Sequence, residues 1–153
     1  MNHTMKPLLP VLVLIASACG ASNGTEPSAS LAFQGQWAGQ HVATSCTPAT
    51  SFFCTALPAT PAPLTLTVTQ TANSASGTLT LGSIVIPVSG AVTGGTLNLS
   101  GGPITVQNLG TERLVSWSST VSGSSMAGSF SWAIDGGPVT ATVSSALQGV
   151  VKQ

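Results

Sequence analysis

Apolar and polar residues alternate along most of the chain beyond Leu64. Leu64, Leu66 and Val68 are each followed by a threonine, and the same period of two returns in later runs. This alternation is typical of β-strands that bury one face, and here the other face carries mainly Ser and Thr hydroxyls. The apolar positions that continue the series are Leu79, Leu81, Ile84, Ile86, Val88, Leu97, Leu99, Ile104, Val106, Val115, Trp117, Val121, Met126, Phe130, Trp132, Ile134, Val139, Ala141 and Val143. Helical spacing persists nowhere beyond a turn or two, so the pattern predicts an all-β protein.

Turn-forming residues separate these runs at short intervals. They lie at residues 73–77, 93–95, 101–103, 121–125 and 135–138, which are rich in Gly, Asn, Ser and Pro. Such segments predict hairpins between sequential antiparallel strands. An open meander of this length would expose two strand edges, which closure removes. We therefore expect an up-and-down barrel of about eight strands, with a two-sheet β-sandwich as the alternative.

The first strand of the barrel is expected within residues 34–42. Its alternation places Trp37 and His41 on one face. A Pro-rich loop is predicted over residues 44–63. Pro87 interrupts an otherwise regular strand, which indicates a bulge or an edge position because proline cannot donate a ladder hydrogen bond.

The N-terminus has the order of a secretory signal. Lys6 precedes the apolar stretch Leu8–Gly20, which is too short to span a bilayer. The residues Ala16-Ser17-Ala18-Cys19 resemble the lipobox of bacterial lipoproteins, although Ala16 stands where Leu is usual. The resemblance implies cleavage before Cys19, which would carry a diacylglyceryl thioether and an N-acyl chain. Cleavage after Ala18 by the ordinary signal peptidase is the alternative, with Cys19 then a spare thiol.

The expected organisation follows from this signal. Residues 1–18 are the signal peptide, residues 19–32 are the lipidated N-terminus and a flexible tether, and residues 33–153 are a single β-barrel domain. Two or three acyl chains would hold the protein stably on a membrane. Gly20 stands where the lipoprotein family's inner-membrane retention signal has Asp, so an outer-membrane or cell-surface location is expected.

The mature chain is nearly uncharged. Charged residues make up 4% of the sequence, and Arg113 and Lys152 face Glu26, Glu112 and Asp135 once Lys6 is removed. Neutralising phosphates takes several basic side chains, so a nucleic-acid partner is excluded.

Cys46 and Cys54 remain as an even pair if Cys19 is acylated. Export makes a disulfide between them the expected state. A metal site is the competing interpretation, but His41 is the single mature histidine, and a structural zinc needs four ligands. No metal and no cofactor are therefore predicted.

The segment Gly35-Gln36-Trp37 resembles the Gly-x-Trp motif that opens the barrel of the calycins, which include lipocalins and avidins. The resemblance implies that Trp37 closes one end of an eight-stranded barrel. It also makes Trp117 and Trp132 candidates to line a ligand pocket, and the apolar Phe130 is a third candidate for that lining. The chain has no Tyr, so no biotin-binding residues are carried over.

The sequence contains no convincing set of catalytic residues. The sequence has no Gly-x-Ser-x-Gly motif that would present a nucleophilic serine to His41. Glu112 and Asp135 are the carboxylates that could act as a pair in glycoside hydrolysis, but both lie near predicted turns. We interpret Glu112 and Arg113 as a solvated surface pair, and His41 as a hydrogen-bonded strand residue. The protein is predicted not to be an enzyme.

Two functions remain open. The first is an envelope-anchored lipoprotein of structural or interaction type, whose filled barrel meets an envelope protein or polysaccharide. The second is a lipocalin-like or avidin-like protein that binds a small apolar or amphiphilic ligand in the barrel. A packed interior would favour the first, and a cavity of several hundred Å³ near the tryptophans would favour the second.

Overall fold

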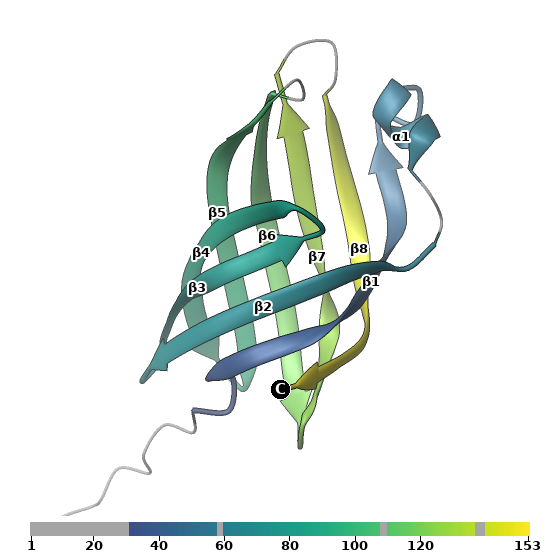
Figure 1. Ribbon diagram of the computed structural model, residues 1–153. Helices are drawn as coiled ribbons and strands as arrows, with labels where there is room; N and C mark the ends of the chain where they lie inside the picture. The colour runs from purple at the N-terminus through teal and green to yellow at the C-terminus, as the bar shows by residue number, and fades with distance from the viewer. Residues whose placement is uncertain (1–30, 58–59, 108–109, 137–139) are drawn as a thin grey trace, which may run out of the picture.

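Eight antiparallel strands follow one another in the described part of the chain and close into a barrel, because the last strand pairs back with the first (Figure 1). The computed structural model describes residues 31–57, 60–107, 110–136 and 140–153. The strands are β1 (Gly35–Thr47), β2 (Ala62–Thr71), β3 (Ser74–Leu81), β4 (Ile84–Thr93), β5 (Thr96–Val106), β6 (Gly110–Ser122), β7 (Ser125–Asp135) and β8 (Ala141–Lys152). The predicted barrel is confirmed, and the sandwich alternative is wrong. The predicted signal peptide, Cys19 and nearly all of the tether lie outside the described residues.

The apolar positions of the alternating pattern point into the barrel and form one core. Leu66, Leu79, Ile86 and Leu97 are fully buried, while the threonines between such residues face outward on most strands. Val115 departs from the prediction, because it is 44% exposed. A register shift between Leu114 and Ser116 turns the strand there, as a β-bulge does, and places Leu114 in the core.

Two glycines from segments expected to be turns, Gly77 and Gly101, lie inside strands β3 and β5. The predicted turn at residues 101–103 is wrong, because β5 runs through it with a shift in its pairing to β6. A Cβ on Gly101 would overlap the carbonyl oxygen of Pro87, and one on Gly77 would overlap that of Thr67. Neighbouring strands approach too closely at these points for any side chain, which lets the small barrel curve.

Pro87 lies at a local strand edge, as its position in the pattern indicated. It is paired with Thr78 of β3, but pairing of β4 with β5 starts only at Val88, opposite Gly101. The missing N–H of Pro87 therefore removes no hydrogen bond from a continuous ladder.

The segment between β1 and β2 is more ordered than a plain Pro-rich loop. β1 continues to Thr47, and the short helix α1 (Phe52–Ala56) follows it. The hydroxyl of Ser51 accepts a hydrogen bond from the Cys54 N–H at 3.1 Å and caps this helix. Cys46 and Cys54 form the expected disulfide, with their Cα atoms 5.5 Å apart, and tie α1 to the end of β1.

Candidate functional site

The three aromatic residues predicted to line a ligand pocket lie in the packed core. Trp117 is 1% exposed and stacks on Phe130, with ring centroids 5.3 Å apart. Phe53 of α1 meets the ring of Trp132 edge-on at 5.5 Å. The indole N–H of Trp117 donates to the Ser119 hydroxyl at 2.8 Å, so this polar atom is already satisfied. The rings fill the barrel with one another, and none of them borders the pocket described next.

Trp37 lies near one end of the barrel, which we call the N-terminal end because β1 begins there and β8 ends there (Figure 1). Its side chain is fully buried, and its indole N–H donates to the carbonyl oxygen of Phe33 at 2.8 Å. The ammonium group of Lys152 lies 5.6 Å from the centre of the Trp37 ring, within cation–π range. The resemblance at Gly35–Trp37 implied such a position, and Trp37 is a core residue there.

Hydrogen bonds hold the segment before β1 against this end of the barrel. The Gln34 N–H donates to the Leu31 carbonyl at 3.0 Å and forms a tight turn. The Phe33 N–H donates to the side-chain oxygen of Gln70, whose amide nitrogen in turn donates to the Ala72 carbonyl. Phe33 is consequently held at 2% exposure beside the β2–β3 turn.

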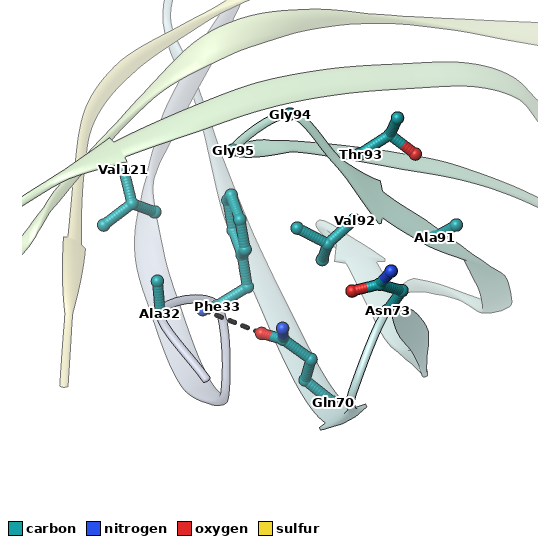
Figure 2. Close-up of a pocket in the computed structure, with 10 residues that line it drawn as sticks. All are labelled: Ala32, Phe33, Gln70, Asn73, Ala91, Val92, Thr93, Gly94, Gly95 and Val121. Atoms are coloured by element: carbon teal, nitrogen blue, oxygen red, sulfur yellow. Dashed lines mark hydrogen bonds between the residues drawn. The ribbon is translucent and has the colours of Figure 1, made fainter. Parts of the chain in front are cut away.

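A pocket of about 500 Å³ lies at the N-terminal end, next to Phe33 (Figure 2). Its apolar walls come from the segment before β1 and from two strands, with Val92 of β4 and Val121 of β6 directed toward Phe33. Ala32 lies at the same side of the pocket as Phe33. Volumes of this size accommodate small organic ligands.

The remaining lining is polar but uncharged. Thr93 at the end of β4 and Gly94 of the β4–β5 turn contribute to it, and Asn73 of the β2–β3 turn lies beside Gln70 of β2. No charged side chain is among the described residues that line the pocket. An apolar wall with a few neutral hydrogen-bonding groups suits an apolar or amphiphilic molecule and gives no partner for a strongly charged one.

His41 lies on the inner face of β1 among core side chains. Its ring is 5.3 Å from that of Phe130, and its Nδ1 lies 3.3 Å from the hydroxyl of Ser145. Burial lowers the pKa of His41 below its ordinary value of 6.5, because the charged imidazolium loses hydration there. The expectation of a hydrogen-bonded strand residue is consistent with this position.

Glu112 is not on the surface, which corrects the predicted solvated pair with Arg113. Glu112 is 1% exposed on the inner face of β6, whereas the neighbouring Arg113 faces outward. No group within the described residues donates to its buried Oε2. Burial raises the pKa of the Glu112 carboxyl because the carboxylate form is poorly hydrated. Glu112 and Leu114 are two positions apart, so they share one face of a strand, and this spacing was a signal that Glu112 points inward. The prediction followed the nearby turn residues instead and placed Glu112 on the surface.

The indole N–H of Trp132 is a second buried polar group without a partner in the described part of the structure. Leu114 pairs with Trp132 and Glu112 pairs with Ile134, so Glu112 and Trp132 are diagonal neighbours on adjacent strands. They lie toward the end of the barrel opposite to the pocket.

No cluster of three or more His, Cys, Asp or Glu side chains suited to a metal ion occurs among the described residues. Cys46 and Cys54 are joined to each other. The helices of residues 31–57, 60–107, 110–136 and 140–153 include none with the length and hydropathy required to cross a bilayer.

The pocket was not predicted from the sequence. Phe33 was expected only as the start of the folded domain, and residues 93–95 only as a turn. Their proximity depends on how the hairpin turns gather around the N-terminal end of a closed barrel, and no spacing in the sequence carries that information.

Comparison with known proteins adds no relative: no family model, no curated protein and no solved structure matches the chain.

Proposed function

We propose that this protein is an exported, lipid-anchored β-barrel of the bacterial cell envelope that acts through binding and not through catalysis. The observation that supports this proposal best is the packed interior around Trp117 and Phe130, which leaves the barrel as a rigid scaffold. Its outer face is rich in Ser and Thr and nearly free of charge, which suits contact with an envelope protein or polysaccharide.

The export and anchoring part of the proposal rests on the residues before the barrel. The apolar stretch Leu8–Gly20 and the lipobox-like Ala16–Cys19 supply the signal and the thiol to be acylated. The disulfide between Cys46 and Cys54 suits an oxidising compartment, where such bonds persist.

Intact-mass spectrometry of the protein from its native host tests this assignment, together with membrane fractionation of a Cys19→Ser variant. The expected wild-type protein begins at Cys19, carries the mass of its acyl chains and sediments with membranes. The Cys19→Ser variant should lose the acyl mass and leave the membrane fraction. Recovery of wild-type protein with Met1 intact and no acyl mass would exclude the proposal.

Binding is tested separately with purified envelope polysaccharide and with envelope membrane vesicles from the same host. Cosedimentation of the exported Cys19→Ser protein with either fraction, saturable by unlabelled protein, is the expected outcome. No retention on either fraction would argue against an interaction role.

A second candidate function is the binding of a small amphiphilic molecule in the pocket beside Phe33. The volume of about 500 Å³ and the neutral, largely apolar lining favour it. A fluorescent fatty acid titrated into the exported Cys19→Ser protein tests this function. Binding of one probe per protein is expected, with Val92→Trp weakening it about tenfold.

Val85→Trp is the matched control for that experiment. Val85 lies on the same strand as Val92, is 52% exposed and does not line the pocket. It should leave probe affinity unchanged. Equal affinity in the Val92→Trp and Val85→Trp proteins would show that the probe binds elsewhere.

A further inference from the structure

The position of the pocket relative to the chain suggests what fills it. Ala32, which lies thirteen residues after Cys19 in the sequence, is part of the pocket lining. A chain of thirteen residues spans at most about 45 Å when fully extended. The lipidated cysteine and the pocket therefore cannot separate by more than about that distance, measured from Ala32.

The segment that leads from Cys19 joins the barrel at the end where the pocket lies and not at the opposite end. The turn closed by Gln34 and Leu31, and the hydrogen bond from Phe33 to Gln70, fix the entering segment at the N-terminal end. Leu31, 50% exposed, adds an apolar side chain immediately before Ala32. A group tethered to this segment is thus present at a high effective concentration near the pocket.

The chemistry of the pocket matches an acyl chain. Its walls include the partly exposed Val92 and Val121 beside the buried Phe33, and a hydrocarbon chain placed there would cover the surface of the two valines that otherwise meets water. An acyl chain is apolar, so the part of it that lies against these walls is shielded from water in the pocket as it is in the bilayer.

The polar lining suits the ester or amide that begins such a chain. The side chain of Asn73 lies beside Gln70 at the pocket (Figure 2). An amide NH₂ donates hydrogen bonds, and an ester carbonyl only accepts them. A neutral linkage of this kind needs no charged partner, and the lining has none.

We propose that the pocket holds one acyl chain of the lipid on Cys19 of the same molecule, while the remaining chains stay in the membrane. The inference rests on the proposed lipid anchor. Two chains suffice for stable membrane attachment, so a triacylated protein can withdraw one chain and stay bound. The N-terminal end of the barrel would then be held close to the membrane surface.

Photo-cross-linking tests the inference on the full chain. The host is grown with a diazirine-containing fatty acid, and the acylated protein is purified into vesicles of phosphatidylethanolamine and phosphatidylglycerol, irradiated and digested. Pepsin is the suitable protease, because Arg113 and Lys152 are the only trypsin sites left once the signal peptide with Lys6 is removed. The expected adducts join the Cys19 lipid to peptides that contain Phe33, Val92 or Val121.

Variants locate the adducts. Val92→Trp should reduce them several-fold by filling the pocket, and Val121→Trp should do the same from a different strand. Val85→Trp is the matched control and should leave the yield unchanged. Far-UV circular dichroism confirms that each variant retains its β-structure, and two pocket variants on separate strands protect the test against the misfolding of one.

Three results would overturn the inference. Adducts confined to phospholipid, or adducts on barrel peptides that Val92→Trp and Val121→Trp leave unchanged, would show that the chain does not enter the pocket. In a mixture of isotopically light and heavy protein, cross-links formed mainly between copies would place the chain in a neighbouring molecule. Intact mass measured before irradiation keeps the two proposals distinct, because a protein without acyl mass on Cys19 would refute the lipid anchor itself.

Discussion

Replacement of Glu112 by glutamine tests whether the buried carboxyl destabilises the folded barrel. The substitution keeps the shape of the side chain and removes its ionisation. Glu112 is 1% exposed, its Oε2 has no hydrogen-bond donor among the described residues, and burial raises its pKa above the ordinary value of 4.5. The folded state therefore binds a proton at Glu112 more tightly than the unfolded state does.

The sign of the pH dependence follows from this raised pKa. Below the unfolded pKa the carboxyl is protonated in both states and contributes no penalty. As the pH rises above that value, the unfolded chain ionises first and the free energy of unfolding falls, until the folded carboxyl ionises as well. A buried polar group without a partner costs about 1 to 3 kcal/mol, and a charged group costs more. The buried glutamine amide incurs the cost of a neutral group as well, so only the extra cost of the charge distinguishes the two proteins. We expect Glu112→Gln to differ little from the wild type near pH 4 and to exceed it by about 1 kcal/mol or more near pH 8.

Urea unfolding followed by tryptophan fluorescence across this pH range measures the difference between the two proteins. Titration of other groups cancels in that difference if they are unaffected by the substitution. Asp135→Asn, at an exposed position at the end of β7, is the matched control and should show no comparable rise. A Glu112→Gln protein that is less stable than wild type near pH 8 would refute the reasoning, because it would mean that the carboxylate is favourably paired.

Three further predictions follow from the structure. The double variant Cys46→Ala/Cys54→Ala should lose about 2.5 kcal/mol, since the disulfide closes a loop with a sequence separation of 8, and its melting temperature should fall by about 10 °C in calorimetry. Gly77→Ala should destabilise by about 1 to 3 kcal/mol in urea unfolding, because its Cβ would overlap the Thr67 carbonyl oxygen; an unchanged midpoint would contradict that geometry. Burial lowers the pKa of His41, so wild-type stability contributed by the neutral ring should be lost as the pH falls below 6.5, and His41→Phe should remove this loss in pH-dependent unfolding; the same loss in both proteins would refute it.

The strands of the barrel were largely predictable from the sequence, but the bulge and the close strand contacts at glycine were not. Period-two alternation identifies an inward face wherever a strand is regular, as at Leu64, Leu66 and Val68. A bulge adds a residue and reverses the alternation beyond it, which is why Val115 was expected inside and Leu114 was not. Glycine is equally ambiguous from sequence alone, because the residues that form turns also permit close strand approach, as Gly101 does.

The candidate site was likewise predictable only in part. The sequence predicted aromatic residues inside the barrel and a disulfide between Cys46 and Cys54, and the structure has both. It did not indicate that Trp117 and Phe130 fill the interior by stacking, since whether a barrel is hollow depends on how side chains from different strands meet.

By itself the sequence determined the class of fold and the order of the strands, because alternation and turn residues are local properties of the chain. Tertiary structure alone decided where the pocket lies and that no described residue donates a hydrogen bond to Oε2 of Glu112. Barrel closure joins β1 to β8 and gathers the segment at Phe33 with hairpin turns that are distant in sequence. Such contacts depend on the spatial positions of several strands at once, and no short stretch of residues encodes them.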